Sequence, residues 1–122
     1  MLVPPPVQHE IATQAPHVAY VPSRAATGWR YQGWVSPHGE VEIVFGKGPQ
    51  MIIFIAAPFS GDCAFSARKT LQYGTVTVYW NHTAAEQRAW RCVHGVRLLA
   101  ATSLQTDVGL GRLVASARRV TG

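Results

Sequence analysis

Charged residues are scarce in this sequence, and those present are dispersed. Asp, Glu, Lys and Arg make up 14% of the 122 residues, against roughly 25% in an average soluble domain. Eleven basic and six acidic residues give a net charge of +5. No long run of like charge occurs, so this pattern supports nucleic-acid binding only weakly. With 11 glycines and 8 prolines, the composition favours a turn-rich, β-rich domain.

Long apolar segments are missing as well. The longest strongly apolar run, 51–58, is far shorter than the roughly 20 residues with which a helix crosses a bilayer. The opening MLVPPPVQHE has neither the basic region nor the apolar stretch of a signal peptide. Its prolines are typical of a tether between a membrane and a domain. We expect residues 1–24 to form an extended Pro-rich arm or linker and residues 25–122 a single domain, with any signal or anchor outside this sequence.

Motifs for catalysis are also lacking. Ser60, Asp62 and His82 are a conceivable hydrolase set, but no G-x-S-x-G elbow surrounds the serine, and its neighbours are typical of a turn. Glu40 and Glu42 lie two apart on a predicted strand, which favours a solvated face over an acid/base pair. We therefore predict a non-catalytic protein that needs no cofactor.

Only two cysteines occur, and they allow three interpretations. A disulfide between Cys63 and Cys92 would close a loop of about 30 residues and stabilise the fold by roughly 3.5 kcal/mol in the chain-entropy model. Two buried thiols would act as small hydrophobic residues. A metal site would have to include His94 and His82 without any C-x-x-C or H-x-x-x-H spacing. We predict the disulfide and no metal, which favours an oxidising, extracytoplasmic location.

Period-two patterns separated by turn residues predict an antiparallel sheet. One segment differs from the others, because the continuous Met-Ile-Ile-Phe-Ile run within 50–57 is typical of a strand buried on both faces. The predicted strands are 29–35, 40–45, 50–57, 75–80, 86–93 and 96–102.

The C-terminal segment has a helical pattern. Leu110, Leu113, Val114 and Ala117 are spaced i, i+3, i+4 and i+7 and so share one face of a helix over roughly 107–119. A single apolar stripe needs one partner surface, which a sheet with alternating strands offers. The predicted fold class is α+β, an antiparallel sheet of five to six strands packed on one face by this helix.

Aromatic residues suggest a binding surface. Trp29 and Tyr31 share one face of the first predicted strand, while Trp34 falls on the other face. We therefore expect Trp34 at a rim or in an exposed patch, where it can bind a protein partner or an apolar ligand. Core packing explains most of the other aromatic residues equally well.

Three arginines on the last predicted hairpin give an alternative function. Arg88, Arg91 and Arg97 lie close together in the sequence and near aromatic residues able to stack on bases. They would allow a nucleic-acid-binding module.

The last hairpin and the helix also resemble a known family. The family comprises uncharacterised bacterial domains that sit outside the membrane on Gram-positive lipoproteins, anti-sigma-factor-like regulators and sporulation proteins. It has no assigned catalytic site, so the resemblance implies a location and no functional residue. The cysteines are not a hallmark of it. The matching residues are Val21-Pro22, Gly28-Trp29, Trp90, Gly95, Val96, Leu98, Leu99 and Ala115-Ser116-Ala117.

The sequence thus predicts a non-catalytic extracytoplasmic domain, secreted or lipoprotein-like, that binds an envelope protein or an apolar ligand. The alternative is a nucleic-acid-binding module that uses scattered arginine and aromatic residues, although no nucleic acid is expected as a partner. A small hydrolase ranks third, because no nucleophile has a visible base.

Overall fold

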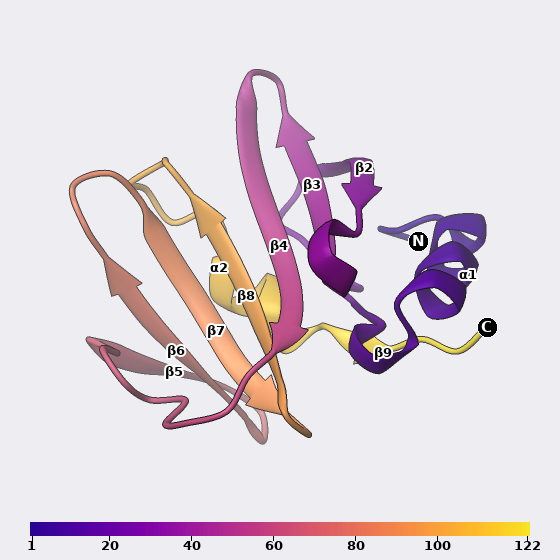
Figure 1. Ribbon diagram of the computed structural model, residues 1–122. Helices are drawn as coiled ribbons and strands as arrows, with labels where there is room; N and C mark the ends of the chain where they lie inside the picture. Colours follow the sequence, from indigo (N-terminus) through magenta and orange to yellow (C-terminus); the bar gives the residue numbers. More distant parts are fainter.

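The computed structural model describes all 122 residues. It has nine strands, two α-helices and two 3₁₀ turns (Figure 1). The helical elements are α1 (Pro5–Gln14), η1 (Pro16–Val18), η2 (Pro37–Gly39) and α2 (Leu110–Ala115). The strands are β1 (Tyr20–Val21), β2 (Arg30–Val35), β3 (Val41–Lys47), β4 (Gln50–Pro58), β5 (Lys69–Tyr73), β6 (Val76–His82), β7 (Gln87–Val93), β8 (Val96–Thr102) and β9 (Arg118–Arg119).

The main sheet has seven strands in the order β2-β3-β4-β8-β7-β6-β5, and every neighbouring pair is antiparallel. The α+β class and the antiparallel sheet are confirmed, whereas the predicted count of five to six strands is wrong. The additional strand is β5, an edge strand in which polar residues alternate with Leu71 and Tyr73. It pairs with β6 alone, so few apolar positions mark it in the sequence.

Helix α2 packs on β5 to β8, and we call the face that it covers the inner face of the sheet. Leu110, Leu113 and Val114 are at most 3% exposed, as the apolar stripe predicts. The helix is shorter than 107–119, because Gly109 has a left-handed backbone (φ 81°) that cannot continue a helix. After α2, the chain becomes extended again and Arg118–Arg119 pairs with β1.

The N-terminal residues cover the rest of the inner face, over β2 to β4. Val3, Ile11, Val18 and Val21 are at most 2% exposed and belong to the same core cluster as Phe45 and Phe54. The predicted extended arm is therefore wrong between Pro5 and Gln14, which form α1. Proline is tolerated in the first turn of a helix, where its missing N–H would have no partner.

A disulfide-bonded loop lies on the opposite, outer face. Residues 59–68 connect β4 to β5 (Figure 1), and the predicted disulfide between Cys63 and Cys92 is confirmed, with a sulfur–sulfur distance of 2.04 Å. The Trp90 indole donates to the Cys63 carbonyl oxygen at 2.6 Å, and the Asn81 amide donates to the Ser66 carbonyl oxygen at 2.7 Å. These contacts hold the loop over β6 and β7.

Candidate functional site

One quarter of the sheet surface carries no covering element. The inner face is covered by the N-terminal segment and α2, and the outer face over β6 and β7 is covered by the loop 59–68. The remaining part, the outer face of β2, β3, β4 and β8, is lined by aliphatic side chains. We call this surface the open face, and it consists of Val35, Val44, Met51, Ile53, Ile55 and Ala101.

The strand register places these side chains side by side. Val44, Ile53 and Ala101 are paired in one row across β3, β4 and β8. In the next row, Val35 is paired with Glu42 and Glu42 with Ile55. Because paired residues point to the same face of a sheet, the rows form a continuous surface rather than separate apolar spots.

The open face is accessible to water. Val35 is 58% exposed and Met51 is 50% exposed, and the side chains of Val44, Ile53 and Ile55 are half-buried. Antiparallel sheets that face water normally present polar side chains on the solvated side. Contiguous exposed apolar patches mark interaction sites, so this part of the molecule is the candidate functional site.

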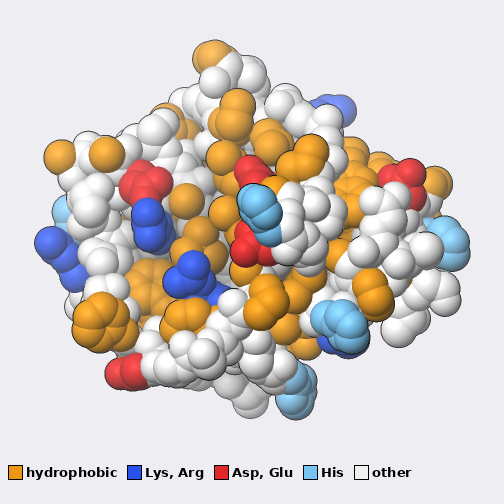
Figure 2. Space-filling view, viewed as in Figure 1, with side chains coloured by type: hydrophobic (Ala, Val, Ile, Leu, Met, Phe, Trp, Pro, Cys, Tyr) orange, Lys and Arg blue, Asp and Glu red, His pale blue; other side chains and the backbone are white.

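Charges of opposite sign border the open face. On one side, Glu42 points outward between Val35 and Ile55. On the other side, the Arg97 guanidinium lies 5.2 Å from the centre of the Phe59 ring. Figure 2 shows apolar side chains between blue groups on one side and red groups next to a pale blue histidine on the other. Neither Glu42 nor Arg97 forms an ion pair within the chain.

A small crevice of about 120 Å³ adjoins the open face at the edge of the loop 59–68. Its lining includes Phe59, Phe65, Arg88 and Arg97. The Asn81 side-chain oxygen is buried there and accepts no hydrogen bond. A partner side chain that entered this crevice would meet two guanidinium groups and one free acceptor.

Trp34 does not form the exposed patch that the sequence predicts. A β-bulge between Tyr31 and Gly33 shifts the register, so that Trp34 and Tyr31 both point to the inner face, opposite Ile43 and Phe45. There the Trp34 indole donates to the Glu10 carboxylate at 3.1 Å. Burial, together with the nearby Glu10 carboxylate, raises the pKa of the Tyr31 phenol. Helix α1 therefore occupies the place that we expected a partner to take.

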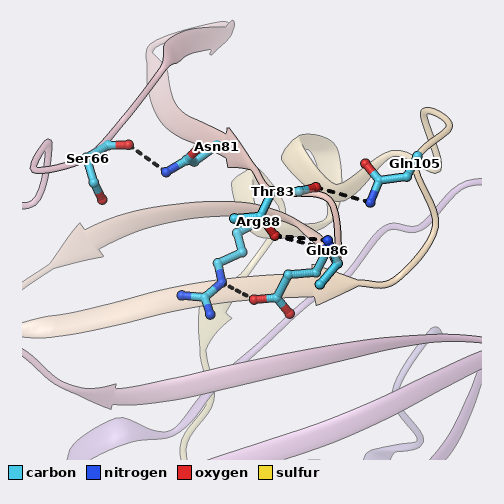
Figure 3. A network of polar contacts seen from close by, with 7 residues as sticks. Ser66, Asn81, Thr83, Glu86, Arg88 and Gln105 are labelled. Atoms are coloured by element: carbon cyan, nitrogen blue, oxygen red, sulfur yellow. Dashed lines mark hydrogen bonds and ion pairs between the residues drawn. The ribbon is translucent and has the colours of Figure 1, made fainter.

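The three predicted arginines do not share a surface. Arg88 and Arg97 point to the outer face, and Arg88 forms an ion pair with Glu86 (Figure 3). Arg91 points to the inner face, where its guanidinium donates to the carbonyl oxygens of Val114 and Ala117, at 3.2 and 2.6 Å. Burial lowers the pKa of Arg91. Its role is to complete the C-terminal end of α2, since a cation there satisfies free carbonyl groups and the helix dipole.

A larger cavity of about 290 Å³ lies on the inner face, near the start of α2. Its polar side chains are already engaged within the chain. The Lys69 ammonium lies 4.3 Å from the centre of the Trp80 ring, the Gln87 amide bonds to Trp80 and to two loop carbonyls, and Asp107 accepts from the Gly109 N–H. These contacts join β5 to β7 with the loop before α2, which is a structural role.

The conceivable hydrolase residues are not assembled. His82 stacks on Trp80 on the inner face, with ring centres 4.9 Å apart, whereas Ser60 and Asp62 lie in the loop on the outer face. The Asp62 carboxylate accepts from the Ala64 N–H within that loop, which is turn chemistry.

Metal-binding and membrane-spanning features were also examined against the structure's side chains and helices. No three His, Cys, Asp or Glu side chains come together as a possible metal site. Neither helix has the length and apolar character needed to span a membrane.

Comparisons with protein families, curated proteins and solved structures give no match to this chain.

Proposed function

We propose that this chain is a non-catalytic, extracytoplasmic domain that binds a protein partner through the open face. The observation that carries the proposal is that the open face is the one part of the sheet that the chain itself leaves uncovered. Strand β4 gives the clearest sign. Its apolar run is typical of burial on both faces, yet within one chain only Phe54 and Ile52 are buried, while Ile53 and Ile55 remain half-exposed.

The disulfide supports the proposed location. Disulfides persist in oxidising compartments and are rare in the cytosol, and Cys63 and Cys92 are bonded to each other with no free cysteine left. The resemblance of the hairpin at Trp90 to extracytoplasmic bacterial domains agrees with this location.

A protein surface fits the open face better than a small apolar ligand does. Ligand pockets are concave and enclose most of their ligand, whereas Val44, Ile53 and Ala101 stand in a row on a continuous sheet. A second sheet packs on such a surface at about 10 Å, with the side chains of both layers interdigitated.

Nucleic acid fits the surface less well. Arg91 is engaged with α2 and Arg88 with Glu86, so few free cations remain near the open face, and Glu42 adds a negative charge to it. We expect no retention on single- or double-stranded DNA at physiological ionic strength, where screening over about 8 Å weakens dispersed charges. Tight DNA binding that falls steeply with salt and is lost on charge reversal at Arg88 and Arg97 would contradict the proposal.

Cysteine labelling tests location and binding together. Val35→Cys in β2 and Thr70→Cys in β5 each place a thiol on the outer face of an edge strand, one in the open face and one away from it. Both variants are expressed in the cells that make the protein and treated with a maleimide that does not cross membranes. Mass spectrometry of the intact Cys63–Cys92 pair serves as a folding control.

The proposal predicts that both variants react at similar rates when purified and dilute. On intact cells, the thiol at position 70 should still react, while the thiol at position 35 should be protected by the bound partner. Equal labelling of both positions on cells would refute binding at the open face. Labelling of position 70 only after lysis would refute the extracytoplasmic location.

A further inference from the structure

We propose that the partner at the open face is a second copy of this chain, stacked face to face about a twofold axis that runs along β4. This inference rests on the proposed function and adds the identity of the partner. It is drawn from the arrangement of charges and apolar side chains across β3, β4 and β8.

The open face is self-complementary about β4. A twofold axis along β4 brings β3 of one copy over β8 of the other, and the second β3 over the second β8. The pairing of β3 with β4 and of β4 with β8 gives the positions that then meet. Ile53 and Ile55 meet their own counterparts at the centre, and Val44 meets Ala101. Apolar residues thus face apolar residues in both layers, as an isologous interface requires.

The charges also match under this axis. Glu42 belongs to β3, and Glu40 precedes the strand with an extended backbone (φ −85°, ψ 171°), so by alternation both point outward. Arg97 lies on β8, paired with Ala57 of β4. The axis therefore places the two glutamates of each copy against Arg97 of the other. None of the three forms an ion pair within its own chain, so each is available for one between chains.

The covering loop does not oppose this arrangement. The loop 59–68 lies over β6 and β7, two to three strands from β4, whereas the sheet ends with β2 two strands away on the other side. Each copy's loop would thus lie beside the β2 edge of its partner. The net charge of +5 acts against association, but Arg112, Arg118 and Arg119 belong to α2 and β9, away from the open face.

The size of the face sets the expected affinity. Four strands spaced by about 4.8 Å, each contributing about seven residues at about 3.4 Å, present roughly 450 Å² on each copy. The total of roughly 900 Å² lies below the range of stable standard-size interfaces and corresponds to a weak, reversible dimer. The dimer should therefore be sought at high protein concentration, up to about 1 mM.

Charge exchange between two variants tests the proposal. Variant X carries Glu40→Arg and Glu42→Arg, and variant Y carries Arg97→Glu. In a dimer of X, only positive groups meet at these positions, and in a dimer of Y only negative ones, so each should associate at least about tenfold more weakly than the wild type. An equimolar mixture of X and Y restores opposite charges at every contact and should recover the dimer. Sedimentation equilibrium measures all four samples.

Two results would overturn the proposal: a wild type that stays monomeric to about 1 mM, or a mixture of X and Y that associates no better than X or Y alone. Loss of folding does not imitate the expected result, because misfolded variants would not regain association on mixing. A monomeric wild type whose position 35 is nevertheless protected on cells would refute the second copy and leave the proposed binding of another protein intact.

Discussion

The two halves of the outer face differ in what covers them. Over β6 and β7, the loop 59–68 is bonded to the sheet through Cys63–Cys92 and covers Trp90, which is only 6% exposed. Over β2 to β4, Ile53, Ile55 and Val44 have no such cover. The loop provides for one half what a partner would have to provide for the other. An apolar sheet face can thus be covered from within the chain or from another chain, and this molecule offers both cases on one surface.

Removal of the disulfide should make the covered half resemble the open half, with the largest effect on stability. The bond joins residues 29 apart in the sequence, and loss of such a cross-link destabilises a fold by roughly 3.5 kcal/mol in the chain-entropy model. We expect Cys63→Ser with Cys92→Ser to lower the free energy of unfolding by about this amount in urea denaturation. Reduction of the wild type with dithiothreitol is the matched control and should give the same loss. A loss below about 1 kcal/mol in both would show that the covered half does not depend on its loop.

Two arginines on the same hairpin should respond differently to truncation, because one supports the inner face and the other borders the open face. Arg91→Ala removes two charge-assisted hydrogen bonds to the end of α2, and a loss of roughly 1.5–3 kcal/mol is expected. Arg97→Ala on the outer face should change the free energy of unfolding by no more than about 0.5 kcal/mol in dilute protein. Equal effects of the two substitutions would contradict the assignment of Arg91 to the inner face.

The sheet was the most predictable part of the fold, because the aliphatic and β-branched strands carry a strong local pattern. All six predicted segments lie in strands of the main sheet. The disulfide was also predictable, since two cysteines in an otherwise motif-free chain leave few other roles. Strand β5 was missed because an edge strand needs few apolar residues.

Features that depend on distant contacts could not be predicted. Helix α1 is recognisable only from the burial of Ile11 against strands far along the chain. The bulge in β2 depends on Gly46 of the neighbouring strand, where the Gln32 side chain occupies the space that a Cβ would need. This bulge reversed the predicted orientation of Trp34, and with it the predicted binding surface. The sequence did contain the open face, in the two-sided apolar pattern of β4, but not the information that one side lacks a cover.

Alkaline pH should weaken the covered inner face by a smaller amount. Burial raises the pKa of Tyr31, with the nearby Glu10 adding to the shift, and burial with Asp107 does the same for Tyr73. In the unfolded chain both phenols titrate near pH 10. Because the folded-state pKa values are higher, their contribution is complete below pH 10 and is lost as the pH rises through the folded values. We expect the wild type to lose stability above pH 10 in urea denaturation.

The variant with Tyr31→Phe and Tyr73→Phe isolates this effect, because it removes both phenols and keeps both rings. It should lose less stability than the wild type between pH 9 and pH 11, values chosen roughly one unit on either side of the unfolded pKa. Identical slopes for the two proteins would show that neither phenol is linked to folding.

The smallest effect is expected in the open face itself, and strand β3 offers a matched pair to measure it. Val41 points to the inner face and is fully buried, whereas Val44 is half-buried and points to the open face. Threonine has nearly the same shape as valine but adds a hydroxyl group. Val41→Thr buries that hydroxyl in the core and should cost roughly 1–3 kcal/mol. In dilute protein, Val44→Thr leaves the hydroxyl near water, so the free energy of unfolding should change by less than about 0.5 kcal/mol. At high concentration, Val44→Thr should still weaken self-association, because the hydroxyl loses water on contact with the second copy. A face that served only folding would show the opposite pattern, with a clear loss of stability at Val44 and no change in association.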